Sequence, residues 1–299
     1  MLHIIFSLTE GNFHSHYSTM ALISLLLLAA LLPQLGHSGG LQGDVWCSTQ
    51  YINIHSSPSS HAVEHTTSTP KASVNVGVLN RVEAEPHSRP YMVSLQAGTQ
   101  HFCGAFLVSE QFVMTAAYCQ TDVNRNITAV IGAHNLTNND PERIHVMEHY
   151  SHPNFTNDQK YPENNIMLLK LAKPVVNASW ISIPEKDEDL EQNTTCSIAG
   201  WGRMKNSGRL SDVLMEANVT MLSSKECKRW WKFNNTLCTD APHRGFCVGD
   251  GGGPLVCNNT AVGIMSFNEK NCVTSKAPQG YTKISGFLPW IRGIISRIK

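Results

Sequence analysis

The stretch that decides the fold is Gly249-Asp250-Gly251-Gly252-Gly253-Pro254-Leu255-Val256-Cys257, in which a glycine-rich segment runs into a short apolar segment ending in cysteine. Around it, from Val78 onward, the chain consists of short β-rich runs separated by Gly, Asn and Pro, such as Tyr91–Leu95 and Ala129–Ile131. Many short strands with turn residues between them are typical of barrels and sandwiches. The sequence therefore predicts an all-β domain.

One helix is predicted, from about Phe287 to Ile298 at the end of the chain. Its apolar residues recur at helical spacing, and the basic residues occupy other positions. The apolar set is Trp290, Ile291, Ile294 and Ile298, and the basic set is Arg292, Arg297 and Lys299. We expect this helix to pack on a protein core and not to enter a membrane.

The amino-terminal part of the chain has the features of a secretory leader. Ala21–Leu32 is an apolar run of signal-peptide length, too short to span a membrane, and Met20 is a suitable start. Small residues before Gly39 indicate a cleavage point, which makes residues 1–38 the leader. An uncut anchor is the alternative. Residues 39–77 are rich in Ser, Thr, His and Pro and predict a flexible extension.

Cysteines and glycosylation sequons point to the secretory pathway. The chain has nine cysteines behind its leader, which indicates disulfides formed in an oxidising compartment. It also has eight Asn-x-Ser/Thr sequons, which predict exposed positions. They begin at Asn126, Asn135, Asn154, Asn177, Asn193, Asn218, Asn234 and Asn258. The fourteen histidines never fall at metal-ligand spacing beside paired cysteines, so we expect neither a metal site nor a cofactor.

The overall charge argues against a partner that binds by electrostatics alone. The 23 basic and 23 acidic residues balance, so we expect no nucleic-acid partner. The two halves of the predicted domain differ. Residues 78–200 carry 8 basic and 14 acidic residues, whereas residues 201–299 carry 14 basic and 6 acidic residues. The second half has either a local basic patch or a solvated mixed-charge surface.

Three segments together resemble the catalytic blocks of the chymotrypsin-like serine proteases. Thr115–Cys119 resembles the His block, Asn164–Leu171 the Asp block and Gly249–Cys257 the Ser block, in the family's order. Further matches are Pro86–Met92, Gly132–Asn135 and Ala199–Gly202. The resemblance covers Val78–Lys299 and implies two six-stranded Greek-key β-barrels packed together with a C-terminal α-helix.

The same resemblance implies how the cysteines pair. Eight cysteines allow 105 pairings, and spacing alone does not choose among them. The family pairs Cys103 with Cys119, Cys196 with Cys257, Cys227 with Cys238, and Cys247 with Cys272. Cys47 is left over as a free thiol, an intermolecular bridge or part of a non-native extension.

Within this family the chain is similar to the haematopoietic granule proteases, the granzymes and azurocidin. Gly249–Gly251, Asn218–Thr220 and Ser207–Leu210 carry the likeness to azurocidin, a relative without catalytic activity. This implies a secreted protein, with storage in secretory granules and a role in innate defence. The strong positive charge of that relative is missing, because residues 78–299 hold 22 basic and 20 acidic residues.

The three catalytic residues of the family are replaced in this sequence. Tyr118 stands where the family has His, Asn165 where it has Asp, and Gly251 where it has Ser. Acyl transfer needs a hydroxyl nucleophile, an imidazole base and a carboxylate that orients the base. Glycine has no nucleophile, and a tyrosine with an ordinary pKa of about 10 is a poor base. In subtilisin the loss of this unit costs about 2 × 10⁶ in turnover, roughly 8 kcal/mol.

The activation segment also departs from the family. Active members begin at a freed terminus whose ammonium pairs with the Asp before the nucleophile, and here the aligned residues are Val78-Leu79-Asn80-Arg81 after Gly77. We expect no efficient cut before Val78. Without that cut, Asp250 is expected to lack its partner and the surrounding loops to be zymogen-like.

Two parts of the cleft are assigned by the same resemblance. Gly245 takes the base of the specificity pocket, and Asn268 and Gln279 take its walls. Their polar side chains either narrow the pocket or are merely drifted positions. The backbone amides of Gly249 and Gly251 take the oxyanion hole. Ser266 flanks this cleft as a possible substitute nucleophile, with no base in view.

The sequence supports a serine protease homologue that binds or signals through its surface loops and does not cut. We expect a monomer without an integral membrane segment, whose partner is a protein or a glycan. A hydrolase with residual or unorthodox activity is the alternative, because the oxyanion-hole amides are retained. A degenerating gene product without a selected role is a third reading.

Overall fold

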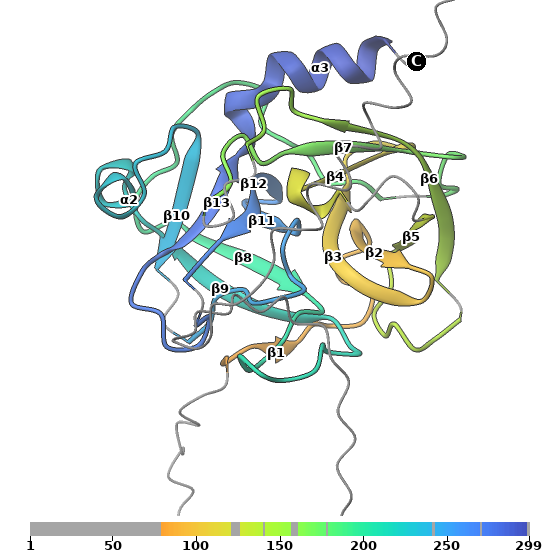
Figure 1. Cartoon of the computed structure of the whole chain (residues 1–299), viewed down its shortest axis with the longest axis horizontal. Helices are drawn as coiled ribbons and strands as arrows, with labels where there is room; N and C mark the ends of the chain where they lie inside the picture. Colours follow the sequence, from red (N-terminus) through yellow and green to blue (C-terminus); the bar gives the residue numbers. More distant parts are fainter. Residues whose placement is uncertain are drawn as a thin grey trace, which may run out of the picture. The chain divides into compact units, whose positions relative to one another are not determined.

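The computed structural model describes residues 79–120, 126–139, 141–156, 161–177, 179–240, 243–269 and 271–297. They belong to one compact unit of the chain, Pro70–Lys299. The predicted leader at residues 1–38, the extension at residues 39–77 and Cys47 lie outside the described residues. Figure 1 shows two β-barrels side by side, with a helix near the carboxyl end of the chain.

The first barrel is a closed sheet of six antiparallel strands in the order β2-β3-β4-β7-β6-β5. The strands are β2 (Met92–Ala97), β3 (Gln100–Leu107), β4 (Phe112–Thr115), β5 (Ile127–Ile131), β6 (Glu142–Ser151) and β7 (Met167–Leu171). The two runs expected to be strands, Tyr91–Leu95 and Ala129–Ile131, are confirmed as parts of β2 and β5. Just after β4, the 3₁₀ helix η1 (Ala117–Cys119) begins the segment that reaches the cleft.

The second barrel is built from the six strands that follow. They are β8 (Thr195–Gly200), β9 (Met215–Met221), β10 (Thr236–Asp240), β11 (Pro254–Cys257), β12 (Thr260–Phe267) and β13 (Gln279–Lys283). Pairing of β9 with β8 closes the sheet, and the short β1 (Val82–Glu83) adds to β9. Along β9, Ala217, Val219 and Met221 are buried while Asn218 and Thr220 are exposed, which is the period of two expected of a strand.

Two α-helices are present in the described residues, one more than the sequence predicted. The expected C-terminal helix is α3 (Leu288–Arg297), preceded by the 3₁₀ helix η2 (Ile284–Phe287); it buries Leu288 and Ile291 against the core of the first barrel. The second helix is α2 (Ser224–Trp230), which begins in a capping box formed by Ser223 and Glu226. None of the helices in the described ranges has the length and apolarity needed to cross a membrane.

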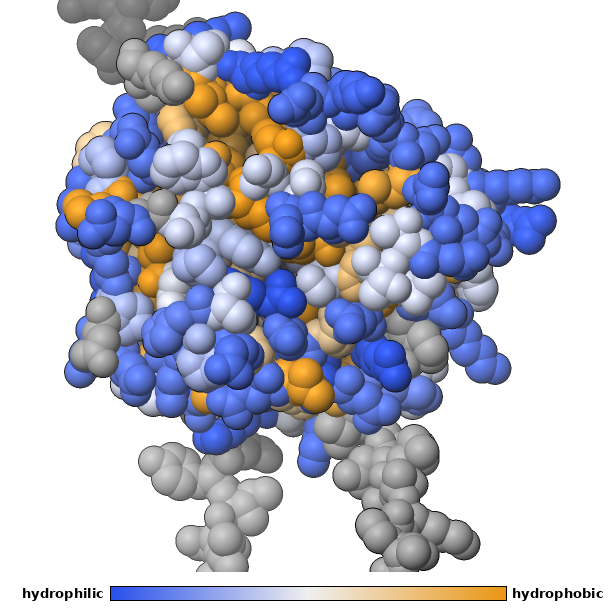
Figure 2. All heavy atoms as spheres, turned by 180° about the vertical axis from the view of Figure 1, so that it is seen from behind, coloured by the Kyte–Doolittle hydropathy of each residue, from blue (hydrophilic) through white to orange (hydrophobic). Residues whose placement is uncertain are grey.

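Four disulfides are present in the described residues. They are Cys103–Cys119, Cys196–Cys257, Cys227–Cys238 and Cys247–Cys272, which are the pairs that the family resemblance implies. Of the eight sequon asparagines, seven are exposed and Asn135 is partly buried. Figure 2 shows one face of the molecule as mostly hydrophilic, with hydrophobic residues gathered in its upper half. Seven of the sequon positions are thus open to the solvent.

Candidate functional site

The three blocks singled out in the sequence meet where the two barrels touch. The Gly104 amide on β3 donates to the Gly251 carbonyl at 2.9 Å, and the Thr115 hydroxyl on β4 donates to the Gly104 carbonyl at 2.8 Å. The glycine-rich loop of the second barrel is therefore held directly against the first barrel. No side chain could separate them at Gly104, where an added Cβ would lie 3.0 Å from the Asp250 carbonyl and the Gly253 amide.

Tyr118 fills the space in front of Gly251. A Cβ placed on Gly251 would collide with the Tyr118 hydroxyl, so the phenol occupies the volume that a side chain at position 251 would need. Burial, and to a lesser degree the negative charge of Asp250, raise the pKa of Tyr118 far above its usual range. The hydroxyl is therefore neutral at physiological pH. It makes no hydrogen bond within the part of the chain that the structure describes.

Asn165 holds the backbone of Tyr118 in place through a hydrogen bond. Its side chain is fully buried; its Oδ1 accepts from the Tyr118 amide at 3.1 Å, and its Nδ2 donates to the Ser266 hydroxyl at 2.7 Å. The Asn165 carbonyl accepts from the Thr282 hydroxyl at 3.0 Å. An amide has no negative charge to stabilise an imidazolium, and both polar atoms of the Asn165 side chain are already engaged. Its role in this arrangement is to hold the η1 segment against the second barrel.

Ser266 lies beside these residues without a base. It is 6% exposed, and its hydroxyl is engaged with the Asn165 amide. Among the described residues, no histidine or carboxylate forms a hydrogen bond with it. A serine activated for attack needs such a partner within about 2.6–3.2 Å.

The loop around Gly251 has a backbone that only glycine adopts easily. Gly249 has φ +99° and Gly252 has φ +86°, and a Cβ at Gly249 would lie 2.5 Å from the Leu210 side chain. Within the described residues, the amides of Gly249 and Gly251 donate to no acceptor. The two amides expected to form an oxyanion hole are thus unoccupied hydrogen-bond donors.

His101 holds the carbonyl side of the same loop, and the sequence reasoning did not identify it. Its Nε2 lies 2.8 Å from the Gly249 carbonyl and its Nδ1 lies 2.7 Å from the Ser94 hydroxyl. Burial lowers the pKa of His101, which keeps the ring neutral. Because a carbonyl only accepts, Nε2–H donates to Gly249 and Nδ1 accepts from Ser94. The ring also packs edge-on against Trp201, 5.7 Å between centroids.

The three residues assigned to the specificity pocket do lie together. The Gln279 Oε1 accepts from the Phe246 amide at 3.2 Å and from the Asn268 Nδ2 at 3.5 Å. The Gln279 amide group packs directly over Gly245, because a Cβ there would lie 2.5 Å from its Cδ. The base of the pocket is thus filled by a neutral amide.

A cavity of about 290 Å³ remains next to these residues. Tyr118, Gly249, Gly251, Ser266 and Asn268 line it together with apolar side chains, namely Phe102, Phe246, Val248 and Phe267. No charged side chain belongs to this lining in the described part of the chain. The cavity therefore offers an apolar surface with neutral donors. Nowhere among the described residues do three His, Cys, Asp or Glu side chains gather as a metal site requires.

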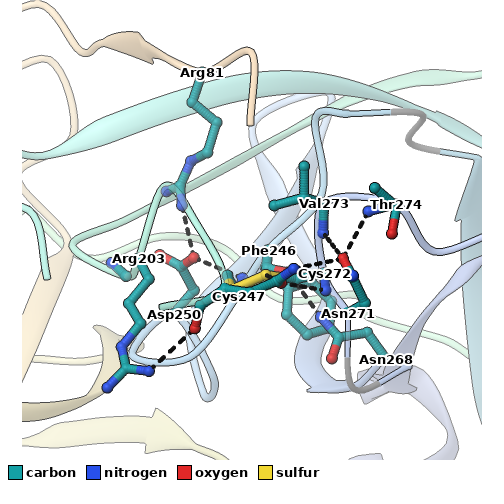
Figure 3. The surroundings of a disulfide bond; sticks show 12 residues. Arg81, Arg203, Phe246, Cys247, Asp250, Asn268, Asn271, Cys272, Val273 and Thr274 are labelled. Atoms are coloured by element: carbon teal, nitrogen blue, oxygen red, sulfur yellow. Dashed lines mark hydrogen bonds and ion pairs between the residues drawn. A yellow bond between two sulfur atoms is a disulfide. The ribbon is translucent and has the colours of Figure 1, made fainter. Parts of the chain in front are cut away.

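Asp250 has a charged partner that differs from the freed ammonium of active family members, and the sequence did not lead us to expect it. Arg81 Nη1 lies 2.6 Å from Asp250 Oδ2, and both side chains are fully buried (Figure 3). Arg81 occupies an aligned position where the family has glycine, and the sequence reasoning considered only the loss of a free terminus. It missed that the long side chain reaches the carboxylate. The available signal was an arginine three residues after Val78, in a segment whose aligned terminus pairs with the equivalent of Asp250 in active family members.

Comparison with known proteins assigns the chain to a family. The trypsin family model, described as "Trypsin", matches residues 78–291. Rat granzyme M is 38% identical over 231 residues, which cover 72% of this chain and 88% of granzyme M. Human cathepsin G is 36% identical over 236 residues, 73% of this chain and 87% of cathepsin G. Mouse granzyme B(G,H) is 36% identical over 224 residues, 70% of this chain and 87% of that protein. With its two antiparallel six-stranded barrels and C-terminal helix, the chain belongs to the trypsin family of serine proteases and is related to the granzymes and cathepsin G.

Proposed function

We propose that this chain is a secreted, non-catalytic serine protease homologue that binds ligands in its cleft. The observation that carries the proposal is the Tyr118 hydroxyl, which fills the space in front of Gly251. A nucleophile at position 251 and this phenol exclude each other. Four disulfides and exposed sequons support secretion, and the relation to granzymes and cathepsin G supports storage in granules.

The chemistry of the cavity supports binding in place of hydrolysis. A neutral phenol and a neutral amide at positions 118 and 165 supply neither a general base nor an orienting carboxylate. The amides of Gly249 and Gly251 and the Tyr118 hydroxyl are donors that a ligand can satisfy. The ligand that fits is a peptide segment that offers carbonyl or carboxylate oxygens beside apolar side chains.

A peptide library displayed on phage tests the binding proposal. The secreted chain is compared with Val248→Arg, which places a charge on an exposed residue of the cavity lining. The matched control is Val176→Arg, a similarly exposed valine outside the lining. We expect peptides enriched on the wild type and on Val176→Arg to lose at least about tenfold in affinity for Val248→Arg, which is about 1.4 kcal/mol. Enrichment that ignores Val248→Arg, or no enrichment on the wild type, would overturn the proposal.

A weak hydrolase is the second candidate, favoured by the two free amides of the Gly249–Gly251 loop. Ser266 is then the hydroxyl with access to the cavity. Hydrolysis of an activated ester by the wild type and by Ser266→Ala separates the two functions. The binding proposal predicts that both proteins turn over ester at the same background rate. A rate that falls with Ser266→Ala would favour the hydrolase.

A further inference from the structure

The side chain of Arg81 is fully buried beside the glycine-rich loop. Its Nη1 contacts Asp250 Oδ2 at 2.6 Å, and its Nη2 donates to the carbonyls of Gly200 and Met215, each at 3.1 Å. Figure 3 shows this pair beside the Cys247–Cys272 disulfide. The guanidinium thus makes one ion pair and two hydrogen bonds to backbone carbonyls at this position.

Asp250 connects the loop that lines the cavity with the segment that follows β8. Its Oδ1 accepts from the Gly202 amide at 2.8 Å, and its Oδ2 accepts from the Cys247 amide at 2.9 Å. The backbone at Asp250 donates to the Cys247 carbonyl and accepts from the Gly253 amide, each at 3.0 Å. The carboxylate thus organises the turn that carries the Gly249 and Gly251 amides. Removing Arg81 would leave the buried Asp250 carboxylate without a cationic partner. An unpaired buried charge strongly destabilises a folded protein.

The segment around Arg81 is anchored on both sides, which directs the side chain inward. Leu79 is 2% exposed and packs with Cys247, Cys272 and Val273, and its amide donates to the Met204 carbonyl at 2.8 Å. On the other side, Val82 pairs with Glu216 as β1 joins β9. Residues 79–83 make these contacts in the uncut chain. The contacts therefore do not depend on cleavage before Val78.

We infer that Arg81 is a positioning residue that sets the Cys247–Gly253 loop, and the donors lining the cavity, without a proteolytic cut before Val78. The loop and its amide donors are then ordered in the intact chain. This inference stands apart from the proposed function, because it concerns how the loop is held and not whether the cavity binds or cleaves.

Hydrogen exchange of the full secreted chain, followed by mass spectrometry, tests it. In one arm, residues 73–77 are replaced by Asp-Asp-Asp-Asp-Lys, so that enteropeptidase frees the amino group of Val78. We expect peptides covering 245–253 and 200–204 to be protected before the cut and unchanged after it. Protection that appears only after the cut would overturn the inference.

A second arm uses substitutions. We expect Arg81→Met to speed exchange in 245–253 at least about tenfold, while peptides of β2 to β4 keep their rates. Arg81→Lys, which keeps the charge, should restore part of the protection. The matched control is Arg89→Met, which breaks the partly exposed ion pair with Glu216 (2.8 Å) and should leave the loop unchanged. An Arg81→Met loop that exchanges as slowly as the wild type would contradict the inference. If Arg81→Met does not fold, the cleavage arm still decides.

Discussion

At the scale of single residues, Tyr118 and Gly251 are complementary. The phenol of Tyr118 occupies the volume that a side chain at position 251 would take. The position of the phenol is therefore compatible with glycine at position 251. Restoring a side chain at position 251 alone would create a collision with the Tyr118 hydroxyl.

This complementarity predicts energetic coupling between the two positions. We expect Gly251→Ala to lower the free energy of unfolding by about 1–3 kcal/mol, because the added Cβ meets the Tyr118 hydroxyl. In a Tyr118→Ala background the same change should cost much less. Urea unfolding of the wild type, both single variants and the double variant measures the coupling. Purely additive costs would contradict the collision.

His101 predicts how stability depends on pH. Burial lowers its folded pKa below the unfolded value of about 6.5, so the unfolded chain binds a proton that the folded chain resists. Stability should therefore fall as pH drops below about 6.5. Burial lowers the pKa of His152 too, which adds to the same trend.

Thermal melts from pH 7.5 to 5.0 check this trend for the wild type, His101→Gln and His152→Gln. We expect His101→Gln to flatten the loss of stability more than His152→Gln, since His101 is the more deeply buried ring. Equal slopes for the wild type and His101→Gln would show that the ring is not neutral in the folded state.

At the scale of elements, short strands and the last helix were predictable, and α2 was not. The strands coincide with short β-rich runs that lie between Gly, Asn and Pro, and α3 repeats its apolar residues at helical spacing. In α2 only Cys227 is buried, so no apolar periodicity marks the helix. The available signal was the Ser223-x-x-Glu226 capping box, which the search for apolar patterns passes over.

The cap of α2 gives a prediction at this scale. The Glu226 amide donates to the Ser223 hydroxyl at 3.2 Å, and the Ser223 amide donates to the Glu226 carboxylate at 3.1 Å. We expect Ser223→Ala to cost about 1 kcal/mol of stability. Ser224→Ala, one position into the helix, should have a much smaller effect, and equal losses in thermal melts would argue against the cap.

At the scale of the whole molecule, the site depends on contacts between distant parts of the chain. The resemblance singled out some of the residues that line the cavity, among them Tyr118 and Gly251, because its motifs are local in sequence. The Arg81–Asp250 pair spans 169 positions, and the His101 contact with Gly249 spans 148. No local pattern reveals which polar groups meet across such separations. The packing of the Gln279 amide over Gly245 likewise depends on a contact between β13 and a loop distant from it in the sequence.

The most direct test of the account is covalent labelling of the full secreted chain with a fluorophosphonate probe. Intact-mass measurement and peptide mapping would follow, with a catalytically active member of the family labelled in parallel. We expect the control to gain one probe and this chain to gain none, because Gly251 has no hydroxyl and Ser266 has no base. An adduct on Ser266, or on any other hydroxyl of the cavity, would show that the cleft still performs catalysis.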